Sequence, residues 1–308
     1  MRSIKTYLEI LRKKGLYVCL REAKKAVWPI WWTHSPAAIS QIQAERASGY
    51  LWRKYGSLII QPLEEPGKQS APTRIIWMCW LQGLDNAPEI VQKCVASVKH
   101  HMPDYKVQIL TSENIFDFVS LPEHIVRKYQ KGTISFTHFS DILRTALLVQ
   151  HGGIWLDATV LLTDELPTQM TETPLFLLQK SKLSQIPHMG SSWFIVANKG
   201  NVILKRVLEL LYVYWEKENK LRDYYLFHLL FYLVLENNEE GKHARRTIPY
   251  VSNVDAHTLQ FSLFDEYNEH IWQQIISRSP IHKLTWKFKD TSLLKKQGTY
   301  YNHILHLS

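Results

Sequence analysis

Residues 136–165 contain the side chains best suited to chemistry. Asp141 and Arg144 lie three residues apart, so a helix would carry both on one side. Asp157 directly follows the apolar run at residues 154–156, and a carboxylate at the end of a buried strand is costly without a cation or polar ligand. A magnesium or manganese ion bridging Asp157 to substrate phosphates would meet this need. So would a turn capped by the carboxylate. Arg144 offers a planar fork to a carboxylate, a phosphate or a sugar hydroxyl.

The elements that position these residues are expected to form an α/β fold. Residues 74–80 and 105–110 are apolar runs of strand length, with a helix expected around 89–100 between them. A further helix, which includes Asp141 and Arg144, is expected to end at residues 152–153, where two glycines favour a C-cap. This alternation predicts an α/β sandwich with a mostly parallel central sheet. Such sheets bind nucleotides at the carboxyl ends of their strands.

The composition excludes several other classes of protein. The 308 residues are 45% hydrophobic, too apolar for a disordered chain, and the longest apolar run, 229–235, is too short to span a membrane. The three cysteines form no C-x-x-C pair, and no signal peptide is evident, which favours a reducing, cytoplasmic location. A Walker loop, a Gly-x-Gly-x-x-Gly fingerprint and a Gly-x-Ser-x-Gly elbow are all absent.

The positive charge is concentrated near the N-terminus. The net charge is +9, and residues 1–28 hold eight basic and two acidic side chains, about two thirds of the excess. Apolar residues fall on one helical face there, and three tryptophans follow at Trp28, Trp31 and Trp32, a combination typical of helices at a membrane interface. Residues 1–35 are therefore expected either to bind an anionic membrane surface or to pack as ordinary surface helices. A nucleic-acid partner is not expected, because the charge lies outside the region with the chemistry.

The central motif resembles a known family. Ser140-Asp141-x-x-Arg144, followed by the run from Gly152 to Thr159, is similar to sugar transferases with an Asp-x-Asp motif. More closely, it resembles the capsular polysaccharide synthesis proteins of bacteria, grouped with glycosyltransferase family 32. Residues 74–83, 87–88, 223–228 and 280–285 also match, so the resemblance runs from about residue 73 to 300. A polar, proline-containing linker at 61–73 suggests two parts: a basic helical region, 1–70, and a transferase domain, 71–308.

The resemblance implies a GT-A-like fold and transfer of a hexose from a nucleotide diphosphate sugar, with UDP as the expected nucleotide and retention at the anomeric carbon. The acceptor would be a growing capsular or other cell-surface polysaccharide, as an oligosaccharide or a lipid-linked glycan, at the inner face of the bacterial cell membrane. Asp141, Arg144 and Asp157 would be catalytic. Donor contacts would come from Trp77, Trp80, Ser140, Gly153, Asp157, Thr159 and Lys283.

The metal site departs from the family pattern. Thr159 stands where a second carboxylate is usual, and a threonine hydroxyl is a poor ligand for Mn²⁺ or Mg²⁺. The resemblance assigns the metal to Asp157 and Thr159, with His282 or His303 completing the site. Alternatively the site is degenerate, and the chain is a non-catalytic partner in a polysaccharide assembly complex.

An acceptor surface is the least defined part of the expected site. Trp193, Tyr224 and His228 would form it if their aromatic rings face the donor, because such rings stack well on sugars. The same residues would serve as ordinary core, since aromatic side chains at helical spacing usually pack inside.

Overall fold

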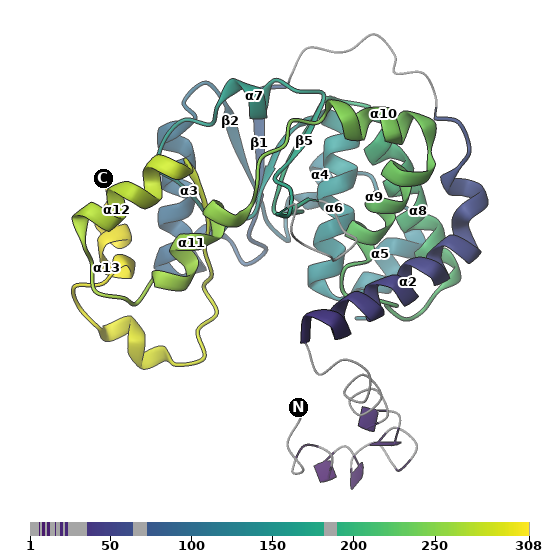
Figure 1. Ribbon diagram of the computed structural model, residues 1–308, viewed down its shortest axis with the longest axis horizontal. Coiled ribbons are helices and arrows are strands. Elements are labelled where there is room, and N and C mark those ends of the chain that lie inside the picture. Colours follow the sequence, from purple (N-terminus) through teal and green to yellow (C-terminus); the bar gives the residue numbers. More distant parts are fainter. Residues whose placement is uncertain are drawn as a thin grey trace.

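The computed structural model describes residues 36–63, 73–181 and 190–307, with scattered residues before Pro36. At its centre is a five-stranded sheet in the order β2-β1-β3-β6-β5 (Figure 1). β1 is parallel to β2 and β3, whereas β6 runs antiparallel to both β3 and β5. All strands of this sheet except β6 therefore point the same way, and the expected α/β fold with a mostly parallel sheet is confirmed. The strands are β1 (Ile75–Cys79), β2 (Lys106–Leu110), β3 (Gly153–Leu156), β5 (Leu175–Leu177) and β6 (Phe194–Ala197).

One face of the sheet is covered by a group of helices, seen on the right of Figure 1. Trp77 of β1 and Trp155 of β3 are paired in register, and both are buried in the core that these helices form. Residues paired in register on neighbouring strands point to the same side of a sheet, so both rings face these helices. The helices are α2 (Pro36–Ile59), α4 (Ile115–Phe118), α5 (Glu123–Gln130), α6 (Phe136–His151), α8 (Val202–Lys217), α9 (Leu226–Asn237) and α10 (Glu239–Thr247).

The opposite face packs on α3 (Glu89–His101), through Ile76 and Met78 of β1. Beyond α3 lie the C-terminal helices and a small antiparallel sheet of β4 (Val160–Leu162) and β7 (Ile281–Lys283). The remaining elements are η1 (Leu84–Asn86), α7 (Thr168–Thr171), α11 (Val254–Ser262), α12 (Glu269–Arg278), η2 (Thr291–Lys295) and α13 (Tyr300–Leu305).

Helix α2 is joined to the rest of the protein through its C-terminal end. The Asn238 side chain donates to the carbonyls of Ile59 and Gln61, at 3.1 and 2.8 Å, and Arg206 donates to that of Gln61 at 3.2 Å. These bonds satisfy carbonyls that the end of a helix leaves without partners. Buried residues of α2, such as Leu51, also belong to the core of α6, α8 and α9. The division at residue 70 stays a prediction.

The two expected strands and the helix between them are confirmed as β1, β2 and α3. The expected stop after the next helix is also found: Gly152 is the C-cap of α6, with φ 73°. Gly153 starts β3 with φ 99°, and a Cβ there would lie 2.5 Å from the Ile75 carbonyl oxygen. This glycine is needed so that β3 can approach β1 closely.

Within the residues that the structure describes, none of the helices combines the length and the apolar character needed to cross a membrane.

Candidate active site

Asp157 lies at the carboxyl end of β3, as the sequence predicts. Its Oδ1 accepts a hydrogen bond of 3.0 Å from the indole Nε1 of Trp155, two residues earlier in the chain. Its Oδ2 lies 3.1 Å from the Lys283 Nζ. Burial of the Asp157 carboxyl would raise its pKa, but Lys283, Arg144 and the Trp155 donor together hold that pKa below its ordinary value. Asp157 is therefore a carboxylate at neutral pH.

Arg144 extends from α6 to the same point and is almost fully buried. Its Nε donates to the Ser140 carbonyl at 3.0 Å, and its Nη2 donates to the Ser140 hydroxyl at 2.8 Å. Nη1 donates to the Ser192 carbonyl and lies 3.5 Å from Asp157 Oδ1. The guanidinium carbon is 5.0 Å from the centre of the Trp155 ring, a cation–π contact. Ser140 and Trp155 thus set the orientation of a cation beside Asp157.

Asp141 lies behind Arg144 and is buried. Its carboxylate is 3.6 Å from Arg144 Nη2 and 3.6 Å from His138 Nδ1. Burial would raise the pKa of Asp141, but the Arg144 charge and the His138 side chain lower it below its ordinary value. Asp141 does not line the cavity described below. Its contacts make it a positioning partner of Arg144 rather than a group in reach of a ligand.

Lys283 joins a distant part of the chain to this site. Strand β7 pairs with β4 so that Lys283 is opposite Val160, directly after Thr159. The ammonium group therefore reaches both Asp157 and Thr159, and it donates a hydrogen bond to the Thr159 hydroxyl. The predicted donor residues Asp157, Thr159 and Lys283 are brought together.

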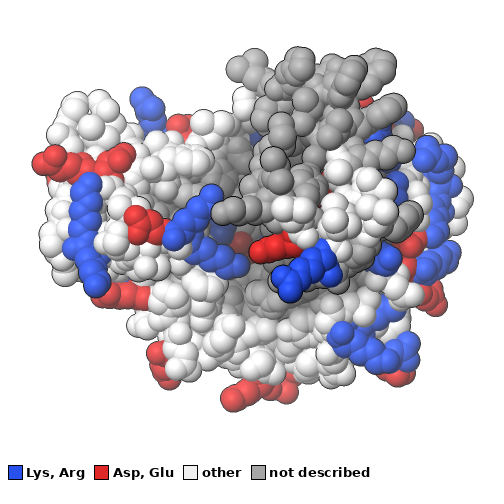
Figure 2. Space-filling model, turned by 90° about the horizontal axis from the view of Figure 1, so that it is seen from below, with Lys and Arg blue, Asp and Glu red and all other residues white. Residues whose placement is uncertain are grey.

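These side chains line a cavity of about 280 Å³, and the face shown in Figure 2 is hollowed near its centre, with Lys and Arg side chains flanking the hollow. Trp80 and Trp286 form an aromatic wall of the cavity, with ring centres 5.3 Å apart. The Trp80 Nε1 is buried and has no hydrogen-bond partner among the described residues. The lining comprises Cys79, Trp80, Leu81, Gln82, Phe136, Thr137, Ser140, Arg144, Trp155, Asp157, Ala158, Thr159, Lys283, Leu284, Thr285, Trp286 and Lys287.

Two predicted donor residues do not line this cavity. Trp77 is 2% exposed, donates its Nε1 proton to the Gly152 carbonyl at 3.0 Å, and packs on Phe118. Trp77 lies in the middle of β1, where this side of the sheet packs on the helical core, whereas Trp80 lies just beyond the carboxyl end of the strand, where the cavity opens. Gly153 lies at the start of β3, away from its carboxyl end, and its role is the close contact with Ile75.

The two histidines expected to complete a metal site lie elsewhere. His282 neighbours Lys283 on β7 and so faces the other side, where its Nε2 is 3.1 Å from the Thr163 hydroxyl. His303, on α13, is stacked 4.1 Å from the centre of the Tyr267 ring. Neither lines the cavity. In the described ranges, no group of three His, Cys, Asp or Glu side chains is placed to hold a metal ion.

The donor set at Asp157 also fits a divalent metal poorly. Asp157 is the one carboxylate among the cavity-lining residues, and the Lys283 ammonium occupies the space between it and Thr159. A Mg²⁺ ion requires oxygen ligands at about 2.0–2.1 Å in octahedral geometry. The residues present therefore do not form such a site while Lys283 keeps this position.

The three residues expected at an acceptor surface are placed differently from one another. Trp193 is buried and meets His257 edge to face, with ring centres 5.6 Å apart. Tyr224 is 64% exposed, and its pKa is raised by desolvation and also by the nearby carboxylates of Asp141 and Asp157. Burial lowers the pKa of His228 to about 4, against the opposing effect of Asp141. Tyr224 and His228 thus lie within electrostatic range of the charged cluster, although neither lines the cavity.

Trp155 and Trp286 line the cavity and are absent from the predicted site. The position of Trp155 was open to prediction, because it precedes Asp157 by two residues and strand alternation puts both on one side. Trp286 reaches the cavity only because β7 pairs with β4, which no local pattern indicates.

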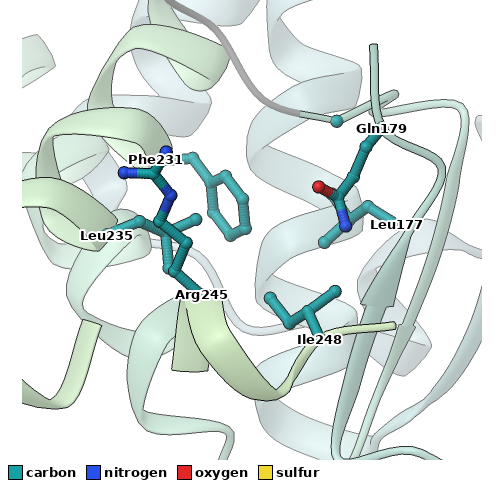
Figure 3. A pocket seen from close by; sticks show the side chains of 7 residues that line it. Leu177, Gln179, Phe231, Leu235, Arg245 and Ile248 are labelled. Carbon is teal, nitrogen blue, oxygen red and sulfur yellow. The ribbon is translucent and has the colours of Figure 1, made fainter. Parts of the chain in front are cut away.

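A second cavity, of about 10 Å³, lies between α9, α10 and the end of β5 (Figure 3). It has room for about one water molecule and is lined mainly by apolar side chains, among them Leu177, Phe231 and Ile248. It is too small to hold a sugar nucleotide.

Comparison with known proteins gives matches along most of the chain. Residues 22–304 match the family described as Capsular polysaccharide synthesis protein. This match begins well before residue 73, so the resemblance extends further toward the N-terminus than expected. A glycosyltransferase named afumC from Aspergillus fumigatus is 29% identical over 161 residues, 47% of this chain and 41% of that protein. The O-glycosyltransferase braB of Annulohypoxylon truncatum is 26% identical over 177 residues, 51% of this chain and 41% of that protein.

The chain thus spans about two fifths of the length of these curated relatives. Among solved structures, one described as PaToxG glycosyltransferase has a TM-score of 0.36 at 14% identity, covering 86% of this chain and 96% of that one.

Proposed function

Because the chain belongs to the capsular polysaccharide synthesis protein family, we propose that it is a glycosyltransferase with a GT-A-like donor site. It would transfer a hexose from a nucleotide diphosphate sugar to a growing capsular or other cell-surface polysaccharide. The observation that supports this most directly is the cavity at the carboxyl end of β3, where Arg144 and Lys283 flank Asp157. Open α/β sheets bind nucleotides at this edge.

The cavity has the chemical groups that a nucleotide diphosphate sugar requires. Arg144 and Lys283 present two cations to the diphosphate, and guanidinium and ammonium groups are the usual protein partners of phosphate oxygens. The Trp80 and Trp286 rings offer an apolar wall for the base. A volume of about 280 Å³ is close to the lower end of the range for small-molecule sites.

In the proposed reaction, the bond between the anomeric carbon and the diphosphate oxygen breaks, and a bond from an acceptor hydroxyl to that carbon forms. Negative charge builds up on the departing diphosphate, and cations fixed beside it lower the barrier. Asp157 holds both cations in place, and Asp141 supports Arg144 from behind. The acceptor oxygen stays in the new glycosidic bond, and its proton passes to the departing diphosphate oxygen. Retention at the anomeric carbon and UDP as the carrier are carried over from the resemblance.

The acceptor is proposed to be an oligosaccharide or a lipid-linked glycan that approaches past Tyr224. This tyrosine is exposed and lies within electrostatic range of Asp141 and Asp157. Tyrosine rings offer both an apolar face and a hydroxyl to a sugar. Trp193 is too deeply buried to share this role. His228 is assigned no contact with the acceptor, because it is partly buried and interacts electrostatically with Asp141.

We also propose that residues 1–35 bind an anionic membrane surface, which would place the protein at the periphery of the inner face of a bacterial cell membrane. Four described leucines there, Leu8, Leu11, Leu16 and Leu20, are 39–62% exposed. They accompany the basic excess of residues 1–28. Exposed leucines beside lysine and arginine are typical of interfacial helices. The three tryptophans that follow lie outside the described residues.

The transferase proposal is tested by screening nucleotide diphosphate sugars for thermal stabilisation, followed by an assay of sugar release. A donor at a hundredfold excess over its Kd adds about 2.7 kcal/mol to the free energy of unfolding, which raises the Tm by several degrees. Asp157→Ala should abolish both effects, whereas Asp104→Ala, at an exposed carboxylate 3.3 Å from Arg74, should leave them unchanged. Binding without sugar release would favour the non-catalytic partner, and binding of no donor would overturn the proposal.

A further inference from the structure

The position of Lys283 suggests how the donor diphosphate is held. Its ammonium nitrogen is 3.1 Å from Asp157 Oδ2 and donates to the Thr159 hydroxyl. These are the two residues of the Asp-x-Thr run that the family resemblance assigns to a metal. The position is fixed by the backbone, because β7 pairs with β4 from Val160↔Lys283 to Leu162↔Ile281.

Asp157 already has a full set of positively charged or donor partners. Oδ1 accepts from Trp155 at 3.0 Å and lies 3.5 Å from Arg144, and Oδ2 lies 3.1 Å from Lys283. A divalent ion bound here would lie within a few ångströms of two like charges, or would have to expel the lysine. Either event costs Coulomb energy that a single carboxylate does not return.

The charge of the cavity matches a diphosphate without added metal. Arg144, Lys283 and Lys287 line it, against the single carboxylate of Asp157. The lining residues alone, three cations and one anion, carry a net charge of +2, which the Asp141 carboxylate behind Arg144 lowers to +1. A diphosphate joined to a nucleoside and a sugar carries two negative charges. Charge balance of this kind favours binding of the anion and disfavours binding of a further cation.

We propose that the Lys283 ammonium takes the place of a divalent metal at this site, so that the diphosphate of the donor binds without one. The proposal rests on the proposed function, since it concerns the donor of that same reaction. The Thr159 hydroxyl then serves to orient Lys283, which explains why a neutral side chain is sufficient at that position.

The test is isothermal titration calorimetry of the full chain with UDP, GDP, CDP, ADP and dTDP, each in EDTA and in Mn²⁺. We expect at least one of them to bind equally well in both. Lys283→Met should weaken that nucleotide about tenfold to a hundredfold, the loss typical of a hydrogen bond to a charged group. The parent nucleoside should bind both proteins equally, because it lacks the phosphates. Lys106→Met, at an exposed lysine of β2, is the matched control.

Lys283→Arg guards against a folding defect, since it keeps the charge and should retain affinity within a few fold. Inorganic pyrophosphate, titrated alone, shows whether the cations select the nucleotide or only its phosphates. Binding that requires Mn²⁺ and disappears in EDTA would overturn the inference and leave the proposed function standing. Equal affinity of wild-type protein and Lys283→Met would also overturn it. Binding of none of these nucleotides under either condition would instead overturn the proposed function.

Discussion

The Nη1 of Arg144 lies 3.5 Å from the Oδ1 of Asp157, and this pair connects helix α6 to the carboxyl end of strand β3. The arginine is held on its helix side by Ser140 and Asp141 and on its sheet side by the Trp155 ring. Lys283 approaches the same carboxylate from β7. The charged centre is therefore assembled from three separate elements, and the predictions below test how each part depends on the others.

Arg144→Lys should destabilise the protein although it preserves the charge. A lysine cannot reproduce the bonds from Nε and Nη2 to Ser140, and the buried Asp141 carboxylate would lose the guanidinium 3.6 Å away. We expect the free energy of unfolding to fall by about 2–4 kcal/mol, measured by urea denaturation. Arg127→Lys, at an exposed ion pair with Glu123, should change it by less than about 0.5 kcal/mol. Equal effects would show that the Ser140 and Asp141 contacts contribute nothing.

His282 should make the protein less stable in mild acid. Burial lowers its pKa to about 4 in the folded state, whereas an unfolded histidine has a pKa of about 6.5. Between these values the unfolded chain binds the extra proton, so the free energy of unfolding falls as the pH drops from 6.5 to 4. The expected slope from this residue is about 1.4 kcal/mol per pH unit.

His282→Gln removes the group that takes up this proton in the unfolded chain, and the glutamine side chain can keep the hydrogen bond to the Thr163 hydroxyl. Urea denaturation at several pH values should therefore show a shallower dependence for the variant than for the wild-type protein. The pKa of His228 is also lowered to about 4. Since both proteins keep this histidine, its contribution to the pH dependence cancels when their curves are compared. Parallel curves for the two proteins across this pH range would contradict the prediction.

Gly153→Ala should be among the most damaging single substitutions at the start of β3. Its φ is 99°, and the added Cβ would lie 2.5 Å from the Ile75 carbonyl oxygen, so the backbones of β1 and β3 would have to separate. We expect a loss of about 2–4 kcal/mol in the free energy of unfolding. Gly132→Ala is the matched control, with φ 69° and no atom within 4 Å of the new Cβ. It should cost about 1–2 kcal/mol, the conformational part alone. Similar losses at the two sites would mean that β1 moves away from the new Cβ at little cost in free energy.

Replacing Lys13, Lys14, Lys24 and Lys25 with glutamine should release the full-length protein from anionic vesicles. Each lysine near such a surface contributes about 1 kcal/mol, so the partition coefficient should fall at least tenfold in a sedimentation assay with phosphatidylserine vesicles. Glutamine at the exposed Lys99, Lys106, Lys131 and Lys205 is the control with the same change in charge. Equal binding by both variants would remove the membrane proposal and favour helices that pack on the protein surface.

Much of the site follows from local sequence. Asp157 was expected at the end of a buried strand because an apolar run of strand length precedes it, and Asp141 and Arg144 were expected on one side of a helix because they lie three residues apart. These patterns depend on neighbours in the chain, and the structure places all three residues accordingly. The mostly parallel sheet was likewise predictable from the order of apolar runs and helices.

Tertiary structure decided which of the other candidates meet. Lys283 reaches Asp157, while the adjacent His282 faces Thr163, because successive residues of a strand point to opposite sides. Trp77 enters the core because it lies in the middle of β1, and Trp80 lines the cavity because it lies just beyond the carboxyl end of that strand. The pairing of β7 with β4 is a contact between distant segments. Sequence alone therefore defined the candidate residues and the strand end at which Asp157 lies. The pairing of β7 with β4 then placed Lys283, and neither His282 nor His303, beside that carboxylate.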